Sequence, residues 1–291
     1  MKYAYKFTPS LLQAFQDYLD SEMLYEKFYG FSEEPSLTFQ EYEDKQLKEL
    51  IDRINRVPFE SEAADRGSAL NEIVDCIVLK TTSTRDDIVV QSLSSFEKLC
   101  ENGAWDMVEN KPLAYEQWFE TIRQPCIYAR KGDHEFYFDV AFCKGVAEYF
   151  KGSLCQIYTE APIETDRGTV LLYGYPDYVR GNVVYDMKTT SKYEFGKYSK
   201  YWQQHLYPWT LIESGKCTDI EAFEFTAFAM KGGSAKSPLI SGVMYPEVYT
   251  YDHKVSTRML RGICTQFADF LEAHRSEITD KKIFGGEKEQ P

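Results

Sequence analysis

The sequence predicts a mixed α/β protein, with a central mixed β-sheet flanked by helices and a helical N-terminal portion. Apolar residues recur at helical spacing through the first 80 residues, whereas apolar runs typical of strands follow from residue 126. Further helical patterns interrupt and follow those strands. An order of helices, strands and helices is typical of a mixed sheet covered by helices, and we expect one domain over residues 1–291.

Residues 1–80 are predicted to contain three helices. Thr8-Pro9 is a typical helix start, with Thr8 as N-cap, and Gly30 ends this helix or its continuation. A second helix runs from about Thr38 to Arg56, and Ser61 begins a third. Each has apolar residues three and four positions apart, so each is expected to bury one face.

Residues 81–125 show the weakest pattern in the chain. Two short candidate helices, at 94–100 and 113–122, follow a Thr- and Ser-rich loop signal. We interpret this stretch as an insertion that acts as a lid or guides a substrate.

Residues 126–275 are predicted to form the core of the domain. Turn signals such as Lys131-Gly132-Asp133 and Arg180-Gly181 separate its strand-like runs. The expected elements are a hairpin with strands at 127–130 and 135–138, a helix at 140–150, strands at 155–161, 169–175 and 182–188, a helix at 199–212 interrupted by Pro208, a strand at 220–230 and a helix at 257–274.

Composition and charge narrow the class of protein. Hydrophobic residues make up 43% and charged residues 27% of the chain, which is ordinary for a folded globular protein. The formal net charge of −13 argues against a protein that only coats nucleic acid, though not against an enzyme whose site contains acidic groups.

The 7 cysteines are scattered and form no CxxC pair, so neither a disulfide framework nor a zinc ribbon is expected. This usage suits a reducing cytoplasm. The chain shows no signal-peptide pattern and no apolar run of about 18 residues, so we expect a cytoplasmic protein without a membrane span.

One predicted hairpin concentrates residues that can carry chemistry. Asp177 is expected at the end of its first strand, with Asp186 and Lys188 on the same face of the second. Two carboxylates, with the Met187 carbonyl, would offer the oxygen ligands that Mg²⁺ and Mn²⁺ prefer. The plain alternative is a surface Asp–Lys pair, but the apolar run Val183–Tyr185 indicates a buried strand.

Such a site can hydrolyse a phosphodiester. A bound metal ion lowers the pKa of a water and polarises the phosphoryl oxygen. Lys188 would orient the nucleophile and stabilise developing negative charge, an effect of about 3–4 kcal/mol.

The segment that follows is basic and aromatic. Gln203 and Tyr207 are four residues apart and share a face of the expected helix. Cationic and aromatic side chains around them could pair with phosphates and stack on bases, although an ordinary amphipathic helix is the alternative. The candidate DNA contacts are Lys192, Lys197, Lys200, Tyr201 and Trp202.

These motifs resemble the RecB-like branch of the PD-(D/E)XK nuclease superfamily. That branch shows G-x-x-x-H on a helix, a strand ending in Asp, a (D/E)-x-K strand and Q-x-x-x-Y on a helix. The matching segments are Gly67 to Asn71, Gly174 to Asp177, Asp186 to Lys188 and Gln203 to Tyr207. Asn71 departs from the pattern, because the family has a metal-binding histidine there, and this leaves the metal affinity and preference open.

The resemblance implies a restriction-endonuclease-like core and a site for Mg²⁺ or Mn²⁺. The implied catalytic residues are Asp177, Asp186, Lys188, Gln203 and Tyr207. The implied metal ligands are Asp177, Asp186, Met187, Asn71 and Glu160, with Glu164 as a competitor of Glu160. Neither an iron–sulfur cluster nor a nucleotide is expected, because only Cys264 lies near the C-terminus and no Walker A motif occurs.

The implied activity is hydrolysis of DNA by metal-activated water, as an exonuclease or on single-stranded ends. The expected setting is replication, recombination or repair in a bacterial cell, with a bacterial or bacteriophage origin and with DNA and proteins of those processes as partners. Two alternatives stay open. One is a structure-specific or restriction-type endonuclease, and the other is a catalytically silent DNA-binding module, which Asn71 and the acidic balance favour.

Overall fold

The strands of the computed structural model, which describes residues 2–32, 34–93, 125–234 and 237–285, form two sheets. The smaller sheet contains β1 (Tyr5–Phe7), β7 (Gly168–Gly174) and β6 (Thr159–Thr165), in that spatial order. The larger sheet contains, in spatial order, β2 (Ile88–Leu93), β3 (Cys126–Lys131), β4 (His134–Asp139), β11 (Leu239–Thr250), β10 (Ala222–Lys231), β9 (Val183–Thr190), β8 (Tyr178–Arg180) and β5 (Leu154–Cys155).

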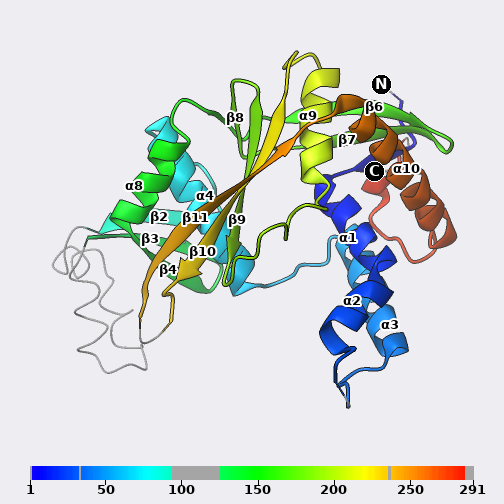
Figure 1. Cartoon of the computed structure of the whole chain (residues 1–291), viewed down its shortest axis with the longest axis horizontal. Coiled ribbons are helices and arrows are strands. Elements are labelled where there is room, and N and C mark those ends of the chain that lie inside the picture. The colour runs from blue at the N-terminus through cyan, green and yellow to red at the C-terminus, as the bar shows by residue number, and fades with distance from the viewer. Residues whose placement is uncertain (1, 33, 94–124, 235–236, 286–291) are drawn as a thin grey trace.

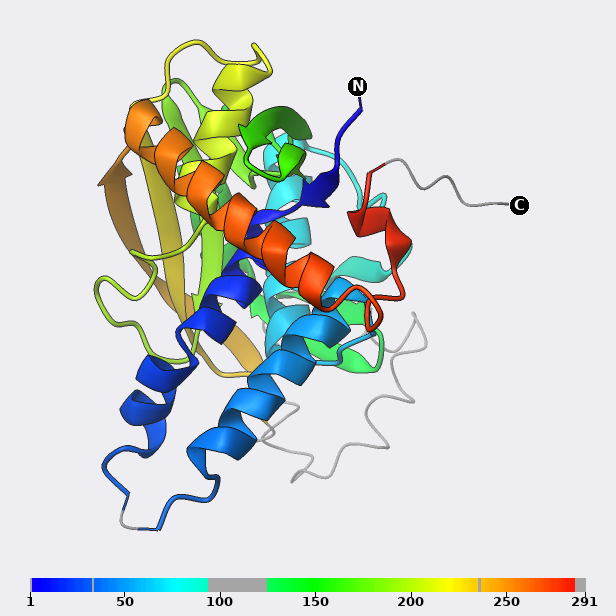
Figure 2. The ribbon, with the colours of Figure 1, turned by 90° about the vertical axis from the view of Figure 1, so that its right-hand side faces the viewer.

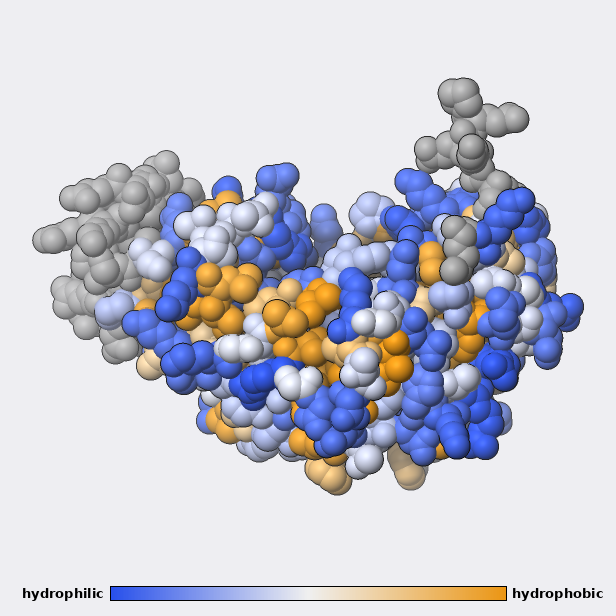
Figure 3. Space-filling model, turned by 90° about the horizontal axis from the view of Figure 1, so that it is seen from above, coloured by the Kyte–Doolittle hydropathy of each residue, from blue (hydrophilic) through white to orange (hydrophobic). Residues whose placement is uncertain are grey.

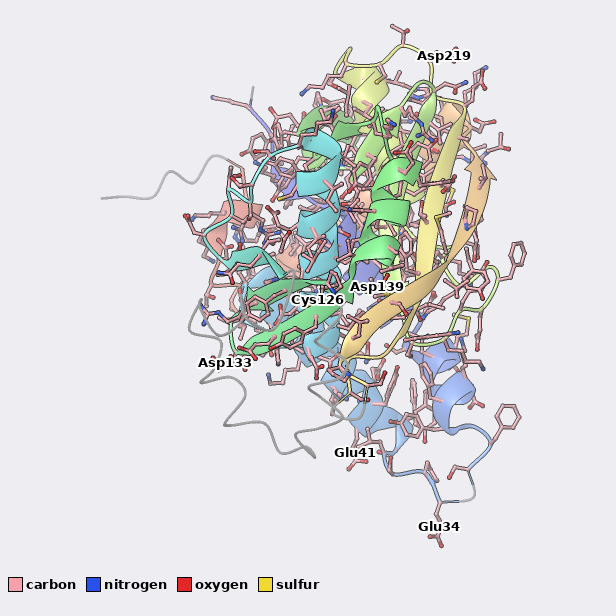
Figure 4. All side chains as sticks on the ribbon, turned by 90° about the vertical axis from the view of Figure 1, so that its left-hand side faces the viewer. Glu34, Glu41, Cys126, Asp133, Asp139 and Asp219 are labelled. Atoms are coloured by element: carbon pink, nitrogen blue, oxygen red, sulfur yellow. The ribbon has the colours of Figure 1, made fainter. Side chains whose placement is uncertain are left out.

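Helices cover both faces of the larger sheet (Figure 1). On one face, α4 (Glu62–Leu79) and α8 (Val140–Tyr149) pack side by side (Figure 4). On the other face lie α9 (Gln203–Glu213) and α10 (His253–Ala273), together with the smaller sheet. The predicted class, a mixed α/β protein with a central mixed sheet flanked by helices, is confirmed.

The remaining helices belong to the N-terminal and C-terminal segments. α1 (Pro9–Leu19) lies against α10, where the rings of Phe15 and Phe267 stack with centroids 4.8 Å apart (Figure 2). α2 (Ser21–Tyr29) and α3 (Phe39–Ile54) extend away from the sheets as a pair, and η1 (Lys281–Ile283) is a short 3₁₀ helix.

The N-terminal helices begin where capping residues predict. The Thr8 side chain accepts a hydrogen bond from the Leu11 N–H, and Thr38 forms a reciprocal capping box with Glu41. Ser61 caps α4 in the same way. The first expected helix divides into α1 and α2, because Asp20 leaves helical geometry between them.

Side chains of β9 and β10 alternate between two apolar clusters. Val184 and Phe225 pack with α1, α9 and α10, whereas Tyr185 and Phe228 pack with α4 and α8. Successive side chains of a strand point to opposite faces, so Asp186 shares the face of Val184 and points towards α9. This alternation decides where the acidic and basic groups of β9 lie.

Several expected elements differ in the structure. The expected strand at 155–161 is two strands, β5 in the larger sheet and β6 in the smaller one. The expected helix at 199–212 begins only at Gln203. Neither β1 nor β11 was expected, although β11 pairs antiparallel with β10 along ten residues.

Part of the expected insertion belongs to the sheet. β2 lies within residues 81–125 and pairs antiparallel with β3. The candidate helices at 94–100 and 113–122 lie outside the described residues. Within the described ranges, no helix combines the length and the apolar character that a membrane crossing requires.

Candidate active site

Of the five predicted catalytic side chains, β9 carries two, α9 carries two and the segment before β8 carries one. Asp186 and Lys188 lie on the α9 side of β9, and Asp177 directly precedes β8, the antiparallel neighbour of β9. The prediction that Asp177 ends a strand is therefore wrong. The preceding strand, β7, ends at Gly174 and belongs to the smaller sheet.

Two hydrogen bonds hold the Asp177 carboxylate, which is 9% exposed. The Met187 N–H donates to Oδ2 at 2.7 Å, and Gln156 Nε2 donates to Oδ1 at 3.1 Å. The pairing of β8 with β9 ends at Tyr185, so the Met187 N–H makes no bond to β8 and can donate to a side chain. Because the N–H and C=O of a strand residue face the same side, the Met187 carbonyl also faces Asp177.

The Asp186 carboxylate, only 3% exposed, lies between an amide and an ammonium group. Gln203 Nε2 donates to Oδ1 at 2.7 Å, and Lys188 Nζ forms an ion pair with Oδ2 at 2.5 Å. Oδ2 is buried and, among the described residues, receives no hydrogen bond of good geometry. This oxygen therefore keeps lone-pair capacity for another positive partner.

The two carboxyl groups are costly to ionise together. Burial, and then the charge of Asp186, raises the pKa of Asp177 to about 7. Burial also raises the pKa of Asp186, although the neighbouring Lys188 opposes that effect. A divalent cation between the two groups would offset both penalties, since an opposite charge favours the ionised form.

A cleft of about 430 Å³ opens at Asp177, and α4 forms one of its walls. Asn71 lines this cleft, as the resemblance implies. The helix approaches β9 closely because Gly67 has no side chain: a Cβ there would lie 3.0 Å from Thr189 Oγ1. Gly67 thus permits the contact that brings Asn71, one helical turn later, to the cleft.

Tyr207 is a buried residue that acts on the site through Gln203. It is 7% exposed, and its hydrogen-bond partners are the Gln203 side chain and the Tyr175 backbone. Its ring fills the space above Gly174, where a Cβ would lie only 2.7 Å from Tyr207 Cε1. Gln203 therefore contacts Asp186 directly, whereas Tyr207 positions Gln203.

The predicted DNA contacts divide into two groups. Lys197, Lys200 and Tyr201 line a groove of about 490 Å³ between α1, α2 and the loop before α9. Lys192 is exposed and pairs with Glu194 at 3.2 Å.

Trp202 corrects the prediction. It is 7% exposed and belongs to the apolar core, because the chain enters α9 at this point and turns the indole inward. A ring buried in this way cannot stack on a base, so Trp202 is a core residue.

Comparisons with known proteins add little. No family model matches the chain, and no curated protein matches it. One solved structure that aligns with it is the crystal structure of SSO0001, at 10% identity over 76% of this chain and 86% of that one, with a TM-score of 0.28. A likeness this low says nothing about the fold or the activity of this chain.

The donor atoms at the site fit a hard cation that needs few protein ligands. Among the described residues, no group of three His, Cys, Asp or Glu side chains is placed to hold a metal ion. Mg²⁺ commonly takes one or two carboxylates and keeps several waters. Asp177, Asp186 and the Met187 carbonyl therefore suffice for it, and Asn71 lines the cleft that opens at Asp177.

Among the described residues, Glu160 forms no hydrogen bond with these donors. It is exposed on β6 of the smaller sheet, where the Tyr158 hydroxyl donates a hydrogen bond to its carboxylate. Glu164, the competing candidate, accepts a hydrogen bond from the Thr169 hydroxyl in the same sheet. Neither of them lines the cleft at Asp177.

Three polar residues near the site were not predicted. Gln156, which holds Asp177, has a left-handed backbone with φ of 48°, and Asp75 accepts a hydrogen bond from the Tyr178 hydroxyl at 2.6 Å. Arg66 precedes Gly67, and its buried Nε has no acceptor among the described residues. Arg66 could have been predicted from its place beside the first motif. Gln156 and Asp75 could not, because only the folded chain brings them to Asp177 and Tyr178.

Proposed function

We propose that this protein is a divalent-metal-dependent nuclease that hydrolyses phosphodiester bonds of DNA. The observation that carries the proposal is the buried pair of carboxyl groups, Asp177 and Asp186, with the Lys188 ammonium in contact with the second. Buried charges of one sign need a compensating partner, and perturbed groups beside a cleft are typical of functional sites.

The residues that would hold the metal ion are Asp177, Asp186 and the Met187 carbonyl. When bound, Mg²⁺ or Mn²⁺ supplies a hydroxide nucleophile near neutral pH and neutralises charge on the phosphate. Asn71 offers an amide oxygen from the wall of the cleft. Oxygen donors of this kind suit Mg²⁺ and Mn²⁺ better than they suit softer metals.

Lys188 is the cation that remains beside the reacting phosphate. Its Nζ contacts Asp186 and lies 5.7 Å from the centroid of the Tyr201 ring, so its position is restricted on two sides. An ammonium fixed in this way stabilises charge as it develops on the phosphate oxygens. Gln203 holds the other oxygen of Asp186, which keeps the carboxylate in one orientation.

The groove that contains Tyr201 supports DNA as the substrate. Three lysines of its lining, Lys27, Lys197 and Lys200, can pair with phosphates, and three carboxylates, Asp17, Asp20 and Glu194, lie in the same lining. Tyr201 is partly exposed beside Lys188. A groove with an aromatic ring beside cations suits a single strand, whose bases are free to stack. We therefore propose action on single-stranded ends or by an exonuclease mode.

A catalytically silent DNA-binding module is the second candidate. The observation in its favour is the lack, among the described residues, of a third acidic, His or Cys side chain placed as a metal ligand. In that case the Lys188–Asp186 pair would serve only to balance charge in the protein.

A cleavage assay separates these candidates. Linear single-stranded, linear double-stranded and circular single-stranded DNA, end-labelled where an end exists, are incubated with Mg²⁺, Mn²⁺ or a chelator. The proposal predicts cleavage of linear DNA with either metal ion and none with the chelator. Cleavage of the circle would indicate an endonuclease, and no metal-dependent cleavage of any substrate would contradict the proposal.

A further inference from the structure

A second pocket lies at the start of α1, separate from the cleft at Asp177. It has a volume of about 190 Å³ and lies between β1, the first turn of α1, the end of α3, β7 and η1. Its polar lining residues are Lys6, Thr8, Ser10, Arg53, Arg56, Tyr173 and Asp280. Segments that are distant in the sequence thus bring three cationic side chains to one small hollow.

The charges in this pocket are not balanced. Asp280 is the acidic residue of the lining, and it pairs with Arg56 at 2.6 Å. Lys6 Nζ lies 4.1 Å from the centroid of the Tyr173 ring, and within the described ranges neither Lys6 nor Arg53 forms an ion pair. The charge of the exposed Arg53 is offset at longer range by Asp17, on whose pKa it acts, and the pocket thus keeps positive charge in a chain of net charge −13.

Neutral donors complete the lining. The Thr8 and Ser10 hydroxyl groups form a hydrogen bond of 3.0 Å with each other at the start of the eleven-residue helix α1, which leaves one of their two protons for a ligand. The partial positive charge of a helix N-terminus favours an anion there, and here it adds to the charges of Lys6 and Arg53. Hydroxyl and cationic donors around a small hollow match a tetrahedral oxyanion.

We propose that this pocket binds a phosphate group. The group could belong to the nucleic-acid strand that the active site cuts, which rests on the proposed function, or it could be free inorganic phosphate. Tyr173 precedes Asp177 by four residues, so their Cα atoms are at most about 14 Å apart. A strand that reaches the catalytic carboxylates can therefore also reach this pocket with a phosphate a few nucleotides away.

Binding of inorganic phosphate tests the pocket without any nuclease activity. The full chain is titrated with phosphate in the presence of a chelator, and binding is measured by calorimetry. Lys6→Gln and Arg53→Gln should each weaken binding about tenfold, as expected for loss of one charge-assisted hydrogen bond. Lys45→Gln, which removes an exposed α3 cation that pairs with Glu49, should leave it unchanged.

Arg56 is left intact, because its pair with Asp280 holds the segment after α3 to the C-terminal segment. Circular dichroism melts check that each variant folds. Phosphate binding that is equal in wild type and in the Lys6→Gln/Arg53→Gln double variant would overturn the proposal.

A second arm identifies the source of the phosphate. Single-stranded oligonucleotides with a 5′-phosphate, a 3′-phosphate or only hydroxyl ends compete with inorganic phosphate in the Asp186→Asn variant. Competition by these oligonucleotides supports a strand phosphate, and its dependence on the end group shows whether that phosphate is terminal. If only inorganic phosphate binds, the pocket stands and its link to the strand is rejected. Phosphate binding in Asp186→Asn together with absent cleavage by wild type would reject the nuclease but retain the pocket.

Discussion

At the scale of single residues, the site combines two buried carboxyl groups with one ammonium group. The Lys188 charge can compensate only one of the two, and the pKa of the other, Asp177, rises to about 7 as a result of burial and of the Asp186 charge. A site with this imbalance is suited to a divalent cation. The ammonium then remains available for the phosphate.

Replacement of Lys188 tests this division of roles. Lys188→Gln is expected to lower kcat for DNA cleavage by about 100-fold or more, the usual effect of losing a group that stabilises transition-state charge. Mn²⁺ affinity should persist, because the carboxylates remain. Lys151→Gln is the matched control, since its exposed side chain pairs with Glu148 at the end of α8, and it should keep kcat within about twofold.

The raised pKa of Asp177 predicts pH-dependent metal binding. Below pH 7 this carboxyl keeps a proton that a metal ion must displace, so the association constant for Mn²⁺ should rise about tenfold per pH unit up to pH 7 and then level off. Calorimetric titrations at several pH values measure it. Binding that stays constant between pH 5 and about pH 8 would contradict this charge balance.

The same pKa acts on the stability of the metal-free fold. The folded state holds this proton more tightly than the unfolded chain, whose carboxyl titrates near 3.9. The stabilisation is therefore complete below about pH 4 and is lost as pH rises through about 7. Asp177→Asn should flatten this decline in denaturant unfolding curves, and an unchanged decline would place its origin elsewhere.

Single-residue predictions from sequence succeeded where strand geometry alone decides. The spacing of two residues correctly placed Asp186 and Lys188 side by side, because alternation in a strand is local. The prediction that Trp202 contacts DNA was wrong, because its burial depends on how the chain enters α9. Gln156 could not be predicted, because it meets Asp177 only after β5 and β8 pair.

At the scale of elements, the position of α9 depends on its contact with β7. Gly174→Ala should push Tyr207 away, destabilise the protein by about 1–3 kcal/mol and lower cleavage activity, because a Cβ would meet the ring at 2.7 Å. Thermal melts and the cleavage assay measure both effects.

Gly145 provides the control for this substitution. It lies inside α8 with nothing within 4 Å of an added Cβ, so Gly145→Ala should stabilise the helix by up to about 1 kcal/mol. Equal effects of the two substitutions would show that Gly174 is not sterically required.

The loop at residues 191–202 is held by a buried carboxylate. Glu247, 2% exposed, accepts hydrogen bonds from the Gly196 N–H at 3.2 Å and from the Tyr249 hydroxyl at 2.5 Å. Glu247→Gln should loosen the loop, speed tryptic cleavage after Lys197 and raise KM for DNA.

Glu194→Gln is the control for that variant, because its exposed carboxylate pairs with Lys192. Mass spectrometry of a tryptic time course compares the three proteins. Equal cleavage rates after Lys197 in all of them would show that Glu247 does not hold the loop.

Elements were predictable from sequence where local signals mark them. Capping at Thr8, Thr38 and Ser61 fixed the helix starts. β11 was missed because Gly242 and Pro246 interrupt its pattern. It tolerates Pro246 because it pairs with β4 only at its first two residues, which leaves that side of the strand without a partner strand among the described residues.

At the scale of the whole molecule, the overall charge and the local charge oppose each other. On the face seen in Figure 3, hydrophilic residues gather towards the edges and apolar residues lie between them, and the net charge of the chain is −13. Such a chain repels DNA at long range, so binding depends on cations within about 10 Å of a phosphate at 0.1 M salt. The groove at Lys197 and the pocket at Arg53 supply such cations.

The class of the whole fold was predictable because the spacing of apolar residues along the chain gives the order of helices and strands. The division of the strands between two sheets could not be predicted, because the smaller sheet depends on the pairing of β7 with β1, which is distant in the sequence.

The central claim is that Asp177 and Asp186 together hold a divalent cation, and electron paramagnetic resonance during a Mn²⁺ titration tests it most directly. Wild type should show one site that is lost in Asp177→Asn and in Asp186→Asn but kept in Glu160→Gln, whose carboxylate is exposed on the smaller sheet. Mn²⁺ binding with the same stoichiometry and affinity in all four proteins would contradict the claim.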